Sequence, residues 1–124
     1  RNPPGGPGPE NALLVASIRL EGQEIILMNG GTGHPLTDAI SLTVNCNSQE
    51  EVDYDWKGLL AGGGQEIACG WLKDRFGLFW QVTPVMLPRP LSDPDRAKAG
   101  RVMQAMMKMI KLDIGTLQAA ADAK

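Results

Sequence analysis

The sequence lacks a surplus of positive charge. Its 124 residues hold twelve Lys and Arg against fourteen Asp and Glu, a formal net charge of −2. Phosphate backbones and anionic bilayers are bound through excess cations, so nucleic acid is not expected as a partner. The chain also lacks an apolar run of the roughly 18 residues that a membrane-spanning helix needs, so no membrane partner is expected.

The sequence is also poor in cysteine and histidine. Cys46 and Cys69 are too few for a disulfide framework and lack the spacing of a structural zinc site, which favours a reducing cytoplasm as the location. The single histidine, His34, lies in a loop rich in Gly and Pro and is expected to be in solvent. A catalytic triad needs a histidine held by packing, so this chemistry is not indicated.

The remaining composition is that of an ordinary globular domain. Hydrophobic residues make up 43% and charged residues 21%, which predicts a single domain with one core over residues 1–124. Residues 1–11 are rich in Pro and Gly. They are interpreted either as a flexible leader or as a segment from inside a longer protein.

Alternating apolar residues predict a β-hairpin followed by a third strand. Residues 12–20 and 23–28 form the two strands, joined by the turn Glu21-Gly22. A loop over residues 29–35 separates them from a strand over residues 39–44.

A helix and three strands are predicted next. Ser48 and Glu51 have the spacing of a capping box, and Val52 and Trp56 begin an apolar stripe at helical spacing. Three glycines at 62–64 end this helix. Strands at 65–69, 70–72 and 78–84 follow, and the turn between the last two, which includes Lys73, is expected in solvent with Asp74 as its cap.

Two helices are predicted at the C-terminal end of the chain. Asp93, followed by a proline, caps a long helix whose apolar face continues through Val102 to Ile110. Asp113 caps a second, shorter helix with Leu117 on its buried side. The first helix is rich in Met, which favours core or dimer packing over an adaptable binding surface.

Four of the six aromatic residues lie within ten positions: Trp71, Phe76, Phe79 and Trp80. Such a concentration can line a ligand pocket or form an ordinary aromatic core. Trp71 and Trp80 can also pack as cross-strand neighbours. The residues alone leave these alternatives open.

A long pattern combines these residues with their neighbours. It comprises Cys46, Glu51-Val52-Asp53, Trp56, Leu59, Gly62-Gly63, the run from Cys69 to Gly77, and Trp80-Gln81. It resembles the PhnB-like branch of the glyoxalase/bleomycin-resistance (vicinal oxygen chelate) superfamily, the "3-demethylubiquinone-9 3-methyltransferase" domain family. The resemblance covers about residues 12–121.

This resemblance implies an α+β fold of two βαβββ modules that form a cupped sheet around a ligand pocket, assembled as a homodimer. Residues 12–38 correspond to the end of the first module, residues 39–84 to the second, and residues 93–124 to C-terminal helices. The opening strand, helix and strand of the first module have no counterpart here, so we expect an incomplete first module.

Enzymes of this superfamily hold a divalent metal through His and Glu side chains on symmetrically placed strands. The resemblance places Ala39 at one His position and Gln81 at the distal Glu position. Alanine cannot bind a metal and a neutral amide binds weakly, so no metal and no cofactor are expected. No glycine-rich loop opens a helix after a strand, so the methyltransferase name is not supported by the sequence.

The sequence therefore predicts a protein that binds a small organic molecule, without identified catalytic residues. The expected ligand-binding residues are Asn29, Ser41, Trp71, Phe79 and Gln81. If Gln81 faces the pocket as in relatives, strand alternation places Phe79 beside it and Trp80 under a helix. Two alternatives remain open: a metal-dependent lyase, isomerase or dioxygenase completed by a further N-terminal segment, and a non-catalytic drug-sequestering protein.

Overall fold

The computed structural model describes residues 1–6 and 8–124. The chain divides into two compact units, Arg1–Pro35 and Leu36–Lys124, which are described separately. The boundary between Pro35 and Leu36 lies in a loop. No helix in the described part of the chain combines the length and the apolarity needed to cross a membrane.

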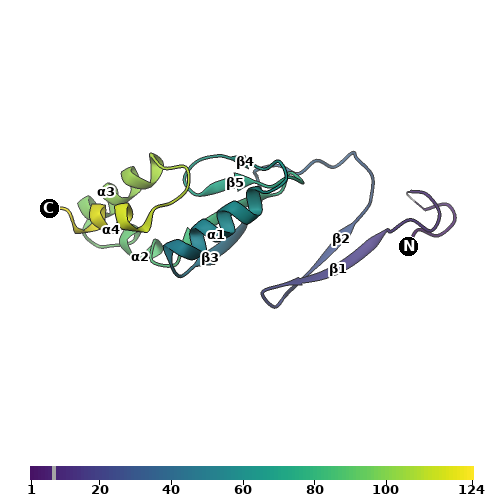
Figure 1. Ribbon diagram of the computed structural model, residues 1–124, viewed down its shortest axis with the longest axis horizontal. Helices are drawn as coiled ribbons and strands as arrows, with labels where there is room; N and C mark the ends of the chain where they lie inside the picture. The colour runs from purple at the N-terminus through teal and green to yellow at the C-terminus, as the bar shows by residue number, and fades with distance from the viewer. Residues whose placement is uncertain (7) are drawn as a thin grey trace. The chain divides into compact units, whose positions relative to one another are not determined.

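The first unit is built on a β-hairpin (Figure 1). Strand β1 (Val15–Leu20) pairs antiparallel with β2 (Gln23–Met28), and Leu20 lies opposite Gln23. Both turn residues, Glu21 and Gly22, have positive φ angles of 48° and 82°, as a type I′ hairpin turn requires. The hairpin prediction is confirmed, although β1 begins at Val15 and not at residue 12.

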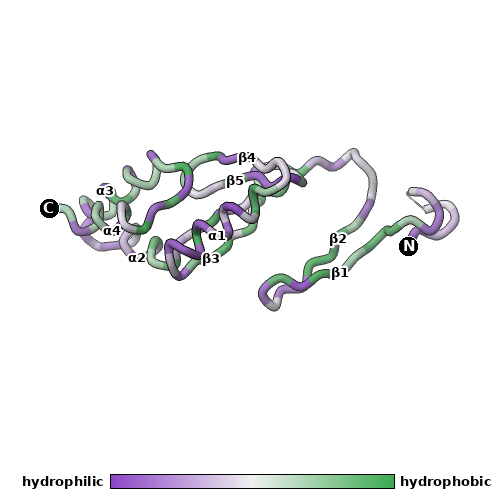
Figure 2. Tube along the Cα trace, in the orientation of Figure 1, coloured by the Kyte–Doolittle hydropathy of each residue, from purple (hydrophilic) through white to green (hydrophobic). Residues whose placement is uncertain are grey.

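The hairpin is apolar on both of its faces. Figure 2 shows hydrophobic colouring along much of β1 and β2. Large apolar side chains from both strands are exposed: Val15, Ile18, Leu20, Ile26, Leu27 and Met28. An isolated two-stranded hairpin is marginally stable in water, so these side chains favour burial against another surface.

The second unit contains a four-stranded sheet with the order β3-β6-β5-β4. Its strands are β3 (Leu42–Cys46), β4 (Gln65–Glu66), β5 (Trp71–Lys73) and β6 (Phe79–Pro84). Strand β3 is parallel to β6, and the other neighbours are antiparallel. Together with helix α1 (Gln49–Leu60), this is the β, α, β, β, β order that the sequence predicts.

Two of the predicted strands of this sheet are wrong by two residues or more at an end. Strand β3 begins at Leu42, because Asp38 and Ala39 lie in a turn. Strand β4 ends at Glu66, well before the predicted residue 69. The reason is the backbone at Cys69 and Gly70, where positive φ angles of 57° and 84° are incompatible with a strand.

Helix α1 covers one face of this sheet and closes the first core. Its buried Val52 and Trp56 pack with Cys46, Leu72 and Val82 from three strands. The capping box is confirmed at the Ser48 hydroxyl, which accepts a hydrogen bond from the Glu51 N–H. The Glu51 carboxylate also reaches back, accepting from the N–H of Asn47.

Three helices at the C-terminal end form the second core. They are α2 (Pro88–Leu91), α3 (Arg96–Met107) and α4 (Ile114–Asp122). Helix α2 was not predicted from the sequence. The buried residues of this core come from the helices and from the segments before α2 and α4: Leu87, Val102, Leu112, Leu117 and Ala121. Asp113 caps α4 as predicted, and its bonds to Thr116 hold the pKa of its carboxyl below the ordinary value of 3.8.

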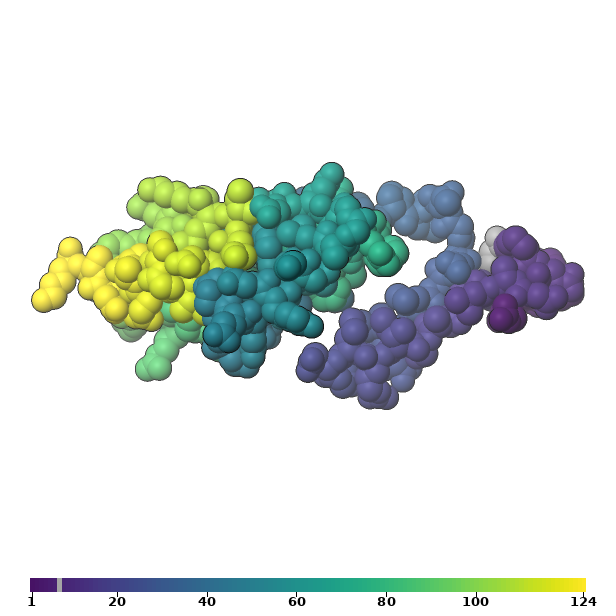
Figure 3. Space-filling model, in the orientation of Figure 1, coloured from purple at the N-terminus to yellow at the C-terminus, as the bar shows by residue number. Residues whose placement is uncertain are grey.

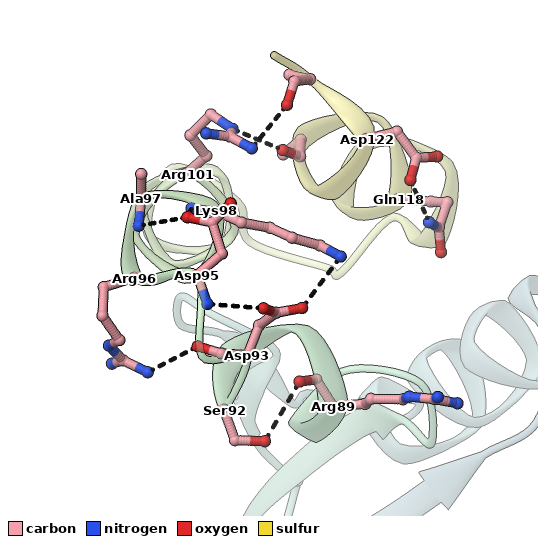
Figure 4. Close-up of polar contacts among 12 residues, drawn as sticks. Arg89, Ser92, Asp93, Asp95, Arg96, Ala97, Lys98, Arg101, Gln118 and Asp122 are labelled. Carbon is pink, nitrogen blue, oxygen red and sulfur yellow. Dashed lines mark hydrogen bonds and ion pairs between the residues drawn. The ribbon is translucent and has the colours of Figure 1, made fainter.

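The cap predicted for the long helix is wrong by two residues. Asp95, not Asp93, accepts from the N–H groups of Ala97 and Lys98. Asp93 accepts instead from the Asp95 N–H, and its carboxylate pairs with the Lys98 ammonium at 3.1 Å (Figure 4). Helix α3 ends at Met107, so the face predicted to reach Ile110 is shorter than expected.

The side chain of Gln49 joins the two cores of this unit. Its amide donates to the Leu112 carbonyl at 3.1 Å and accepts from the Ile114 N–H at 2.7 Å. Beside it, the Lys111 ammonium pairs with the Asp53 carboxylate at 2.7 Å. Figure 3 shows the C-terminal end of the chain, in yellow, beside the α1 region, in dark teal. The start of α1 is thereby fixed to the loop before α4.

Candidate ligand-binding site

Strand alternation divides the sheet of the second unit into two chemically different faces. On β6, Val82 is fully buried in the core beneath α1, and Trp80 packs against the same core. Phe79 and Gln81 alternate with these residues and therefore lie on the opposite face. The expected register of β6, with Trp80 under a helix and Gln81 on the other side, is confirmed.

The cross-strand register extends this opposite face over β3 and β5. Gln81 lies between Trp71 on one side and Thr43 on the other. Phe79 lies opposite Lys73. We call this surface the aromatic-polar face, and it comprises Ser41, Thr43, Trp71, Lys73, Phe79 and Gln81. All of these except Thr43, which is exposed, are partly buried.

Two contacts order the side chains of the aromatic-polar face. The Gln81 amide donates to the Ser41 hydroxyl at 2.9 Å, which fixes the orientation of both groups. The Lys73 ammonium lies 5.9 Å from the centre of the Phe79 ring, within the range of a cation–π contact. The face therefore offers two aromatic surfaces, hydroxyl and amide groups for hydrogen bonding, and one cation.

Four of the five predicted ligand-binding residues share this face, and the fifth does not. Asn29 belongs to the first unit, where its side-chain amide donates to the Leu13 carbonyl at 2.8 Å. Its backbone N–H donates to the Leu14 carbonyl. In the described structure Asn29 holds the open end of the hairpin together.

Lys73 is a candidate site residue that the sequence did not predict, because Lys73-Asp74-Arg75 is typical of a solvated turn. It is instead the last residue of β5 and is partly buried. The turn that follows is capped by Asp74 as expected: its carboxylate accepts from the N–H groups of Phe76 and Leu78 and from the Trp80 indole. The period-two spacing of Trp71 and Lys73 was the signal that could have identified the lysine.

The side chains at the presumed metal positions do not fit a metal. Ala39 has no ligand atom, and the neutral Gln81 amide is hydrogen-bonded to Ser41. Within residues 1–6 and 8–124, no three His, Cys, Asp or Glu side chains come together as a metal site. A first-row metal generally needs about three or four such ligands, and these positions do not supply them.

The two cysteines do not form a disulfide. Burial and the neighbouring Asp55 carboxylate, which accepts a hydrogen bond from the Cys46 thiol, raise the pKa of that thiol to about 12. The Cys46 thiol is therefore un-ionised near neutral pH and is a poor nucleophile. Cys46 has a packing role in the core.

Comparisons with known proteins agree on one family. Residues 1–83 match the family model described as 3-demethylubiquinone-9 3-methyltransferase. A solved structure of a PhnB protein from Bacillus cereus, which carries the same methyltransferase name, is 30% identical in sequence. The similarity covers 68% of this chain and 74% of that chain, with a TM-score of 0.59. No curated protein sequence matches.

Proposed function

The chain belongs to the PhnB-like family, the 3-demethylubiquinone-9 3-methyltransferase domain family of the glyoxalase/bleomycin-resistance superfamily, and on that basis we propose that it binds a small organic molecule. Its fold is the mixed α+β fold of that superfamily. The proposed site is the aromatic-polar face.

The observation that carries this proposal is the arrangement of Trp71, Phe79 and Gln81 on one sheet face, with Gln81 held by Ser41. Small-molecule sites in proteins combine apolar and aromatic surface with a few oriented polar groups. Trp71 and Phe79 supply the aromatic surface. The Gln81 carbonyl can accept hydrogen bonds, and the Ser41 hydroxyl can donate one. The occupant expected from this chemistry is a planar organic compound.

Binding at this face can be measured through the three tryptophan indoles. The Trp56 indole donates a hydrogen bond to Glu66 on the α1 side of the sheet. The Trp80 indole donates to Asp74 in the turn between β5 and β6. With the neutral planar probe 2-naphthamide, we expect the indole N–H signal of Trp71 to shift in a proton–nitrogen correlation NMR spectrum. The signals of Trp56 and Trp80 serve as internal references and should move little.

A pair of phenylalanine variants provides the matched control. Phe79→Ala should weaken 2-naphthamide binding about tenfold, because stacking surface is removed from the site. Phe76→Ala should leave binding unchanged, because Phe76 lies in the turn beneath Arg75 and is 74% exposed. Equal effects of the two variants, or shifts confined to Trp56 and Trp80, would contradict the proposed site.

We further propose a metal-free homodimer. Exposed apolar residues support an interface between copies: the hairpin side chains of the first unit and, in the second unit, Met103, Met107 and Ile110. Native mass spectrometry of freshly purified protein should give twice the chain mass of 13.3 kDa, with no bound metal. A stable monomer would contradict the dimer, and one metal per chain lost in a Gln81 variant would restore the metalloenzyme alternative.

Methyl transfer is not part of this proposal, despite the family name. A common nucleotide-type methyltransferase site uses a glycine-rich loop that opens a helix. In the described part of the chain the glycine clusters are placed otherwise: residues 62–64 follow α1, and residues 30–33 lie in a loop of the first unit.

We also propose a cytoplasmic location, supported by the two unpaired thiols. We propose no nucleic-acid partner, supported by the net charge of −2.

A further inference from the structure

We infer that the occupant of the aromatic-polar face is an aromatic acid, whose anionic group is recognised by Lys73. This inference rests on the proposed function and specifies the class of ligand. It follows from the charge of the face. Of the six residues that define it, Lys73 is the ionised one, and the others are neutral Ser, Thr, Trp, Phe and Gln.

The Lys73 ammonium has no carboxylate partner within the described residues. The ion pairs in that part of the chain are Arg19–Glu24, Lys98–Asp93 and Lys111–Asp53. Asp74 follows Lys73 in sequence, but both of its oxygens already accept hydrogen bonds from the turn and from the Trp80 indole. The Lys73 ammonium is therefore available to pair with an anionic group that does not belong to the sheet.

Two further contacts fix where that charge acts. The ammonium lies over the Phe79 ring at 5.9 Å, so an aromatic ligand stacked on this face carries its substituents within reach of it. The nearby Arg75 does not share this role: its guanidinium stacks on Phe76 at 4.6 Å and its side chain abuts Gly62, at the end of α1. A partly buried cation beside aromatic surface favours an anion over a neutral ligand of the same shape.

The experiment compares two probes of nearly identical shape, 2-naphthoate and 2-naphthamide, with dissociation constants measured by titration of the Trp71 indole signal. We expect 2-naphthoate to bind about tenfold more tightly, because an ammonium–carboxylate contact is stronger than an ammonium–amide contact. Lys73→Met should remove this preference, so that the two probes bind with similar dissociation constants. The matched control, Lys57→Met on the exposed side of α1, should keep the preference.

A second measurement needs no variant, in case Lys73→Met does not fold. Raising the salt concentration from about 0.01 M to about 1 M shortens the screening length from about 30 Å to about 3 Å and should weaken 2-naphthoate selectively in the unaltered protein. Equal affinity for both probes, or a preference that survives Lys73→Met, would overturn the acid inference alone. Failure of both probes to shift Trp71 would overturn the binding function as well.

Discussion

Replacing Trp80 with alanine is expected to lower the free energy of unfolding by about 3–5 kcal/mol, the usual cost of truncating a large aromatic residue in a core. Trp80 lies on the α1 side of β6, where it packs against the cluster of Val52, Trp56 and Val82. Its indole also donates to the Asp74 carboxylate at 2.9 Å. Both the packing and this bond are lost in the variant, and urea unfolding measures the combined effect.

The neighbouring variant Gln81→Ala is the control for this prediction. Gln81 lies on the aromatic-polar face and makes one side-chain hydrogen bond, to Ser41. Because both groups are only partly buried, water can replace that bond, and the stability should change by about 1 kcal/mol or less. Its effect should appear in ligand binding. A large loss of stability for Gln81→Ala with a small one for Trp80→Ala would show that the two faces are assigned in reverse.

Replacing Gly70 with alanine is expected to cost about 3 kcal/mol, for two additive reasons. The φ angle of Gly70 is +84°, a conformation that costs an L-residue about 1–2 kcal/mol. The added Cβ would also lie 2.9 Å from Leu112 Cδ1 and 3.1 Å from the Val82 carbonyl oxygen. Leu112 is only 1% exposed, so it can move only by disturbing the second core, and such overpacking costs about 1–3 kcal/mol.

Gly77→Ala separates the two contributions. Gly77 has nearly the same φ angle, +89°, but no atom lies within 4 Å of the position of an added Cβ. This variant should therefore lose only about 1–2 kcal/mol from the strained backbone. Urea unfolding of both variants tests the difference. If Gly70→Ala is no more destabilised than Gly77→Ala, the contact between Gly70 and Leu112 does not constrain the fold.

The sequence by itself determined the features that depend on neighbouring residues. Alternation along residues 79–82 assigned Trp80 and Gln81 to opposite faces, because a strand turns successive side chains in opposite directions. The caps at Ser48 and Asp113 were predictable because a cap bonds to an N–H two or three residues away. Both signals act over a few residues, so they can be recognised in the sequence without knowledge of the fold.

The competition between nearby caps was decided only by tertiary structure. Asp93 and Asp95 both have the side chain of a helix cap, and the sequence favoured Asp93 because a proline follows it. In the fold, Asp93 instead bonds to the Asp95 N–H and to Lys98, and Asp95 caps α3. Local propensity does not rank two candidate caps two residues apart when one of them has a second partner.

The candidate site was likewise only partly determined by sequence. Its aromatic residues were identified by their concentration, but the inclusion of Lys73 followed from its position in β5 opposite Phe79. The Ser41–Gln81 bond joins residues 40 positions apart, and the Gln49–Leu112 bond joins residues 63 apart. Such contacts leave no local signal, because they exist only once the strands have paired and the helices have packed. Sequence alone therefore determined which residue types this protein has for binding, and tertiary structure decided which of them meet.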